Sequence, residues 1–366
     1  MDKLFFELLQ AALWNRPLNH QGETLSHVRL SELTQLATQQ AVMGLVSQGL
    51  MDSGIRLERE DALNLYAVQQ GIRRQHKVMD EAVVRLIHEM QGRDIRVFVF
   101  KGQPLARCYS DPSLRQSGDI DFYCYPEDWN KALAYFKEEL KLPINDLYTE
   151  KDVGFFRGGI AYELHNRLTL FANPWHARYW ERVVMPEILA NAYTVDINGC
   201  QVPTLAPTYN VLYVFVHIFQ HLISDGIGLR QFCDWARVLS VQHDEIDVEV
   251  LERHLKGIGL DKAFTGLGAI LTDYLGLPAE RFPYAITEKD HQRVVSLMND
   301  ILQKGNFGRN QPSGYKPGIM HGLVHLRKIY RQSIQFGYYA PAEVWWKIPY
   351  MFKWWGMKIR RMVVNS

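Results

Sequence analysis

Two aspartates separated by one residue open the segment Asp119-Ile-Asp-Phe-Tyr-Cys-Tyr125 of this 366-residue chain. The segment alternates polar and apolar residues, as a strand with one solvated face does, so it predicts a strand that projects Asp119 and Asp121 from one face. Two carboxylates at that spacing suit Mg²⁺, which binds a few carboxylates together with substrate phosphates. A third carboxylate from a neighbouring strand would complete a two-metal site, and Glu163 is the natural candidate.

These carboxylates belong to a longer, ordered set of motifs. In chain order the motifs are Lys101-Gly102, Tyr109, Arg115, Asp119-Ile120-Asp121 and Glu163-Leu164-His165, followed by His217, His221, Asp225-Gly226, Leu229-Arg230 and Asp234-Trp235. The set spans roughly residues 90–240 and resembles the polymerase-β-like nucleotidyltransferase superfamily, most closely a poorly characterised bacterial nucleotidyltransferase family within it. The resemblance implies metal-dependent transfer of a nucleoside monophosphate from an NTP to a hydroxyl acceptor.

The resemblance also implies roles for the three carboxylates. Phosphoryl transfer needs charge neutralisation on the triphosphate and in-line placement of the acceptor oxygen. Asp119 and Asp121 would hold two Mg²⁺ ions. Glu163 would hold one of these ions and could draw the proton from the acceptor hydroxyl.

Other matched residues are expected around the phosphates. Gly102 would let its backbone N–H reach a phosphate oxygen without a Cβ in the way. Lys101 and Arg115 would add positive charge beside the triphosphate, Arg115 through a bidentate contact. Gln103 stands where the superfamily usually has Ser or Gly, so the usual serine hydroxyl contact to phosphate is missing. The remaining expected cleft residues are His165, Asp225, Arg230 and Asp234.

Each of these residues also has a purely structural interpretation. The three carboxylates could be solvated strand acids, and Lys101 could be a solvated cation at a strand end. Arg230 and Asp234 stand at i and i+4, so a plain surface pair on a helix would explain them. His217 and His221 share that spacing, and we interpret them as packed or hydrogen-bonded, since no third ligand stands at zinc-site spacing.

The sequence pattern around these residues predicts an α+β fold in three parts. The parts are a helical region at 1–91, a small mixed β-sheet nucleotidyltransferase core at 92–205 and a helical region at 206–366 with a basic aromatic tail. Helices are predicted over residues 4–13, 30–50, 61–90, 129–140, 209–224, 229–241, 248–256 and 262–274. Strands are predicted over residues 95–100, 119–125, 154–157 and 160–165, and a hairpin over 193–205. Gly158-Gly159 and Asn198-Gly199 are the expected hairpin turns.

Composition places the chain among ordinary globular proteins. Apolar residues make up 47 % and charged residues 22 %, which excludes wholesale disorder, collagen and coiled coil. Asp2 and Glu7 argue against a signal peptide, and apolar runs such as 211–216 are too short to span a membrane. The four cysteines form no C-x-x-C pair, so reduced thiols in the cytoplasm are the simplest interpretation.

Charge is distributed unevenly along the chain. Residues 301–366 carry eleven Lys and Arg but one acid, a net charge of +10, whereas residues 1–300 carry −9. Four tryptophans alternate with cations in this tail, at Trp345, Trp346, Trp354 and Trp355. We expect a terminal helix that packs some of its tryptophans onto the helical region, rather than a contact with nucleic acid or a membrane surface. Two alternative functions stay open: an idle nucleotide-binding or regulatory protein on the same fold, and a membrane- or RNA-associated scaffold that acts through the tail.

Overall fold

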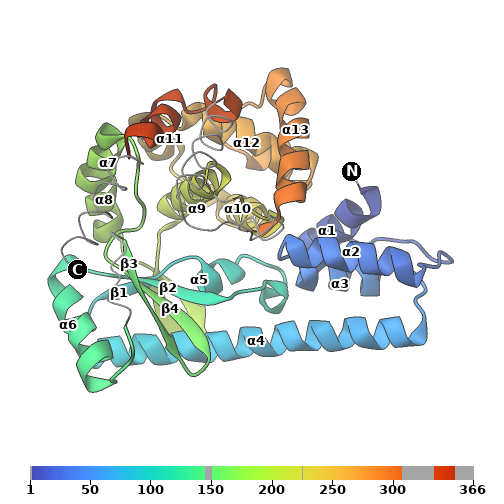
Figure 1. Cartoon of the computed structure of the whole chain (residues 1–366), viewed down its shortest axis with the longest axis horizontal. Helices are drawn as coiled ribbons and strands as arrows, with labels where there is room; N and C mark the ends of the chain where they lie inside the picture. Colours follow the sequence, from blue (N-terminus) through green and yellow to red (C-terminus); the bar gives the residue numbers. More distant parts are fainter. Residues whose placement is uncertain (1, 145–150, 225, 307–333, 351–366) are drawn as a thin grey trace, which may run out of the picture.

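A four-stranded mixed sheet forms the centre of region 92–205 (Figure 1). The computed structural model describes residues 2–144, 151–224, 226–306 and 334–350. Across the sheet the strands lie in the order β1 (Val97–Val99), β2 (Asp119–Cys124), β4 (Ile160–His165) and β3 (Asp152–Arg157). β2 is parallel to β4, whereas β1 and β3 pair antiparallel at the two edges. A small mixed sheet among many helices confirms the predicted α+β class.

Both predicted hairpin turns are present. Gly158 and Gly159 join β3 to β4 with φ of 58° and 80°, and Asn198 and Gly199 join β5 (Tyr193–Ile197) to β6 (Cys200–Thr204) with φ of 52° and 80°. Positive φ at both central residues is the requirement of the tight turns whose twist matches that of paired strands, and Gly and Asn meet it at little cost. β5 and β6 form a separate two-stranded sheet.

The two faces of the main sheet pack against different helices, because side chains alternate along a strand. On one face, the even-numbered residues of β2 are buried in a core shared with the long helix α4 (Arg59–Gln91), which runs beneath the sheet in Figure 1. On the other face, Tyr123 joins a larger core that includes α9 (Pro207–Leu222) and α10 (Leu229–Val241). The odd-numbered residues of β2, which include both aspartates, therefore face α9 and α10.

The helical stretch predicted over residues 30–50 is interrupted in the structure. It divides into α2 (His27–Gln39) and α3 (Met43–Asp52). At the break, the Gln40 side chain accepts the backbone N–H of Leu229 at 3.2 Å and donates to the carbonyl oxygen of Leu302, in α13 (Glu288–Lys304), at 3.2 Å. These long-range hydrogen bonds hold the start of α10 and have no local sequence pattern, which is why the periodicity missed the break.

The other helices lie mostly where periodicity predicted them. They are α1 (Lys3–Trp14), α5 (Gly102–Ala106), α6 (Trp129–Ala134) with a π-turn at Tyr135–Glu139, α7 (Pro174–Tyr179), α8 (Met185–Ala190), α11 (Val248–Gly257), α12 (Asp261–Asp273) and α13 (Glu288–Lys304). Short 3₁₀ turns lie at Pro112–Leu114, Pro126–Asp128, His243–Glu245 and Ala279–Arg281, and a π-turn at Trp180–Val184 joins α7 to α8. The sequence did not predict α7, α8 or α13. Among the described residues, no helix is both long enough and apolar enough to cross a membrane.

The described part of the C-terminal tail is anchored through Glu343 on residues 172–173 of region 92–205, whereas we expected tryptophans to pack on the helical region. Glu343, the single acid of the tail, is 3 % exposed and accepts the backbone N–H groups of Ala172 and Asn173 at 2.5 and 3.2 Å. Trp345 is 54 % exposed, and Trp346 is half-buried against another tryptophan. Trp354 and Trp355 lie outside the described residues.

Candidate active site

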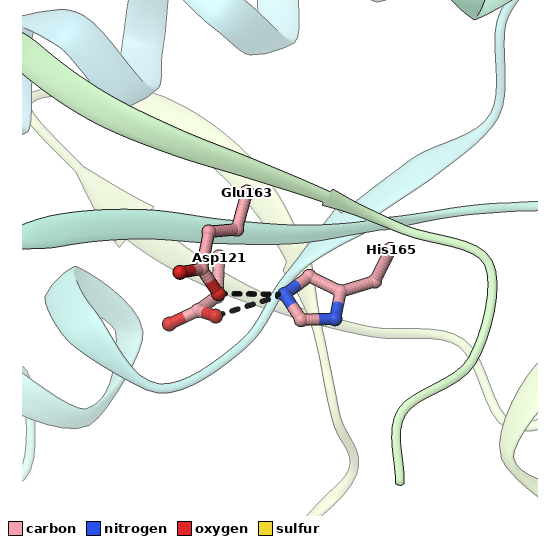
Figure 2. A group of neighbouring side chains, drawn as sticks. All are labelled: Asp121, Glu163 and His165. Carbon is pink, nitrogen blue, oxygen red and sulfur yellow. Dashed lines mark hydrogen bonds and ion pairs between the residues drawn. The ribbon is translucent and has the colours of Figure 1, made fainter. Parts of the chain in front are cut away.

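The parallel pairing of β2 with β4 brings two of the expected carboxylates together. Asp121 is the register partner of Glu163, and Tyr123 is the partner of His165, so Asp121, Glu163 and His165 share one face of the sheet. His165 Nε2 lies 2.9 Å from Asp121 Oδ1 and 3.4 Å from Glu163 Oε2 (Figure 2). One ligand atom from each of the three side chains lies within 4.8 Å of the other two, a spacing that a single metal ion can bridge.

Lys101 neutralises Asp121 in this arrangement. The Lys101 ammonium donates to Asp121 Oδ1 at 2.9 Å, and both side chains are largely buried. Burial alone would raise the pKa of the Asp121 carboxyl, but Lys101 and His165 outweigh it and hold that pKa well below its usual range. Burial would lower the pKa of Lys101, yet the charge of Asp121 raises it above its usual value. Both groups are therefore charged at neutral pH.

Asp119 lies in a different electrostatic environment from Asp121. Burial, and next the negative charge of Asp121, raise the pKa of Asp119, with a further contribution from Glu163. Asp121 is buried, whereas Asp119 and Glu163 are partly buried, and a divalent cation would stabilise this set of carboxylates by relieving the repulsion at Asp119. The residues present therefore fit a divalent metal ion.

The three carboxylates open into a cavity of about 190 Å³ between the sheet and helices α9 and α10. This volume is below the ~300–1,000 Å³ of pockets that enclose a drug-sized molecule, and it suits metal ions and phosphate groups. The charged and polar residues of its wall are Lys101, Arg115, Ser117, Asp119, Asp121, Lys151, Glu163, His217, His221, Arg230, Gln231 and Asp234. Most of the residues singled out in the sequence thus line one cavity, while Asp225 lies outside the described residues.

The turn that carries Lys101 and Gly102 is held from behind by helix α4. Both residues have positive φ, 58° and 42°, at the start of α5. Gln103, the next residue along the chain, does not line the cavity. Its amide donates to Asp80 of α4 at 2.5 Å, and Arg107 donates to both oxygens of the same carboxylate at 2.7 Å. Gln103 therefore anchors the turn instead of contacting phosphate.

Arg115 occupies the cavity wall, but its bidentate fork is already engaged. Nε and Nη2 donate to the two carboxylate oxygens of Asp234 at 2.7 and 2.8 Å, and the Tyr109 hydroxyl donates to the same carboxylate at 2.7 Å. Arg115 and Asp234 are 5 % and 3 % exposed. The bidentate phosphate contact expected of Arg115 is therefore not open in this structure, because Asp234 takes both donors.

Arg230 is not paired with Asp234 as a helix surface pair would be. Its guanidinium donates to the carbonyl oxygen of Gln116 at 2.9 Å, while its Nε is buried without a hydrogen-bond partner. Burial, together with the neighbouring charge of Arg115, lowers the pKa of Arg230. A cation in such an environment gains from an anionic ligand, and Arg230 faces the cavity that holds the carboxylates.

Lys151 and the two histidines of α9 complete the wall. Sequence reasoning missed Lys151, which precedes β3 and belongs to no motif; only the fold brings it to the cavity, where burial and Lys101 lower its pKa. His217 stacks on Tyr213 and packs against His221, with ring centroids 6.2 and 4.4 Å apart. Burial and Lys101 lower the pKa of His217 well below its usual range, so this ring is neutral at pH 7.

We compared the chain with curated proteins, solved structures and models of protein families. No curated protein matches the chain. Among solved structures, an antigenic nucleotidyltransferase-like protein from Paracoccidioides brasiliensis aligns with 13 % identity over 54 % of this chain and 92 % of its own, with a TM-score of 0.34, a likeness too low to carry an argument. A family model described as uncharacterised nucleotidyltransferase matches residues 26–276, a range that contains every residue of the cavity wall. The chain belongs to this family of uncharacterised nucleotidyltransferases.

Proposed function

We propose that this protein transfers a nucleoside monophosphate from an NTP to a hydroxyl acceptor and releases pyrophosphate. One observation carries the proposal: the parallel register sets Asp121 beside Glu163, on the face that opens into a cation-lined cavity, in a chain of a nucleotidyltransferase family. This group of carboxylates serves a divalent metal better than it serves stability, because the charges of Asp121 and Glu163 raise the cost of ionising Asp119.

In this proposal Asp119, Asp121 and Glu163 hold two Mg²⁺ ions. When bound, the ions would neutralise the triphosphate and make the acceptor hydroxyl easier to deprotonate. Glu163 would also receive the acceptor proton. His165 is a positioning residue, because its Nε2 contacts both Asp121 and Glu163 and fixes their orientation.

Cations from two sides would hold the phosphates. Lys101 comes from the sheet side and Arg230 from α10, and both line the cavity. Arg115 is paired with Asp234, so this pair would stabilise the cavity wall and would not bind the substrate. The backbone of Gly102, free of a Cβ, is the element that would come closest to a phosphate oxygen.

The test is a labelling experiment with the full-length protein. It is incubated with Mg²⁺, a cell extract and each of the four α-labelled NTPs in turn, and the labelled product is identified. Asp121→Asn, which keeps the shape of the side chain but removes an anionic ligand, should abolish labelling. Asp244→Asn makes the same change at an exposed residue outside the cavity wall, so it is the matched control and should give as much labelled product as the wild type. Labelling that survives in Asp121→Asn would refute the two-aspartate site.

Binding measurements on the same protein, with NTP and Mg²⁺, RNA and anionic vesicles, separate the alternatives. Mg²⁺-dependent NTP binding without any labelled product would favour an idle nucleotide-binding or regulatory protein on this fold. Binding of RNA or anionic vesicles without NTP binding would favour a scaffold that acts through the tail. We also propose a cytoplasmic location, which the four buried free thiols support.

A further inference from the structure

The sheet face that carries the candidate metal ligands continues past them to the edge strand β3. Antiparallel pairing makes Gly154 the register partner of Glu163 and Phe156 the partner of Ala161. Ala161 is in turn the partner of Asp119 on β2. Because residues directly opposite each other on paired strands project from the same face, Asp119, Ala161 and Phe156 form one row across this face. With strands about 4.8 Å apart, the two ends of the row are separated by about 10 Å.

The Phe156 side chain is exposed on this face. Its exposed fraction is 71 %, the highest among the large apolar residues in the described part of the chain. Phe155 points to the opposite face, where it is 3 % exposed and stacks on Tyr162 with ring centroids 5.3 Å apart. The core beneath the sheet therefore accounts for Phe155 and not for Phe156. A single exposed apolar residue is ordinary on a protein surface, but this one shares a face with the candidate metal ligands.

The strip of sheet between the carboxylates and Phe156 carries almost no side-chain bulk. Its two residues are Gly154 and Ala161. Gly154 is exposed, and a Cβ at its position would meet the carbonyl oxygen of Tyr162 at 3.9 Å and no closer atom of the described residues outside its own chain neighbours. A ligand that leaves the carboxylates along this strip would therefore reach the Phe156 ring without a steric barrier.

The carboxylate cavity opens toward this strip. The side chain of Glu163 is 41 % exposed, whereas that of Asp121 is 4 % exposed, so Glu163 marks the mouth of the cavity. The register partner of Glu163 on the outer side is Gly154. At about 190 Å³ the cavity is too small for a whole NTP, since pockets for drug-sized molecules measure ~300–1,000 Å³. A triphosphate held inside leaves the sugar and the base outside, on the side where the cavity opens.

We propose that Phe156 is the platform on which the base of the bound NTP stacks. The triphosphate would lie at the carboxylates, and the sugar would cross the strip of Gly154 and Ala161. Every base has a flat π-face, so this contact would hold all four NTPs without selecting one of them. This inference rests on the proposed function, because it places the NTP that the proposed reaction consumes.

The test compares a ligand that has a base with one that lacks it. Calorimetric titration of the full-length protein in the presence of Mg²⁺ measures the affinities for ATP and for inorganic triphosphate. Phe156→Ala should weaken ATP binding about 5- to 150-fold and leave triphosphate binding unchanged. Phe156→Tyr keeps the ring and should bind ATP as the wild type does. Phe156→Leu keeps an apolar side chain without a ring, so it should lose most of the affinity that Phe156→Ala loses.

Tyr66→Ala is the matched control. Tyr66 is an aromatic residue of α4 that is 55 % exposed and lies outside the cavity wall, so its removal should leave both affinities unchanged. Thermal melts of the same samples check the fold, and Phe156→Ala should melt close to the wild type because its side chain is exposed.

The outcomes separate this inference from the proposed function. Equal ATP affinity in the wild type and Phe156→Ala would overturn the stacking contact and leave the phosphate site in place. Equal losses of ATP and triphosphate affinity in Phe156→Ala would also overturn it, since Phe156 would then act on the shape of the site and not on the base. A wild type that binds neither ligand would refute the proposed function, and the stacking contact with it.

Discussion

Two arginines on the wall of the carboxylate cavity should behave in opposite ways when they are removed. Arg115 is held in a buried pair with Asp234, whereas Arg230 has a buried Nε without a partner. We therefore predict that Arg115→Ala lowers stability and that Arg230→Ala lowers NTP affinity. The contrast tests which arginine binds phosphate.

The expected loss for Arg115→Ala follows from the burial of the pair. Removal of one partner leaves the Asp234 carboxylate with only the Tyr109 hydroxyl, and breaking a buried pair in this way costs about 3–5 kcal/mol. The entropy of unfolding is about 2.1 cal/mol/K per residue, or about 0.8 kcal/mol/K for a chain of 366 residues that melts as one unit. The melting temperature should therefore fall by about 4–7 °C.

The expected loss for Arg230→Ala is in binding. A hydrogen bond to a charged group contributes about 1.5–3 kcal/mol, so NTP affinity should fall about 10- to 150-fold. Its stability should change little, because burial already disfavours the charged form of Arg230. Exposed Arg182 provides the matched control, and Arg182→Ala should change neither quantity.

Calorimetric titration with NTP and Mg²⁺, together with thermal melts, measures both quantities on the same samples. If Arg115→Ala melts as the wild type does but loses NTP affinity, its fork binds phosphate and our account of the pair is wrong. If Arg230→Ala keeps wild-type affinity, Arg230 is not a phosphate ligand.

Three further predictions concern buried acids and their partners. Burial works against ionisation of Asp80, but its hydrogen-bonding partners lower its pKa to about 2. The ionised carboxylate should therefore add about 2 kcal/mol to the free energy of unfolding above pH 4, and this contribution is lost as the pH falls toward 2. In acid-unfolding titrations Asp80→Asn should lose this pH dependence, and an unchanged profile would contradict the assignment. Glu343→Gln should lower the melting temperature by a few degrees through loss of charge-assisted hydrogen bonds, and an unchanged melt would mean that the tail docks by other contacts. In Lys101→Ala nothing from Lys101 holds down the pKa of Asp121, so the pH below which Mn²⁺ no longer binds should rise. Calorimetric titration with Mn²⁺ from pH 4 to 7 measures this pH, and an unchanged value would refute the role of Lys101.

Local patterns were enough to predict most of the elements and the face of β2 on which its two aspartates lie. Period-two alternation after Gly118 predicted β2 with both aspartates on one side, and Gly-Gly and Asn-Gly predicted the two hairpin turns. These features depend on residues a few positions apart, so the sequence contains all the information that they need. The break at Gln40 was missed because its hydrogen bonds reach residues far along the chain.

The partners of each charged side chain were decided by the tertiary structure. The sequence alone determined that Asp119, Asp121 and Glu163 would be strand carboxylates, but the parallel register made Asp121 the neighbour of Glu163. Arg115 could equally have faced phosphate, and only the packing of α10 against the 3₁₀ turn region supplied Asp234 as its partner. Lys151 has no motif at all. Burial raises the cost of an unpaired charge, so each such group takes the partner that the folded chain brings within reach, and that partner lies too far along the sequence for any local pattern to reveal it.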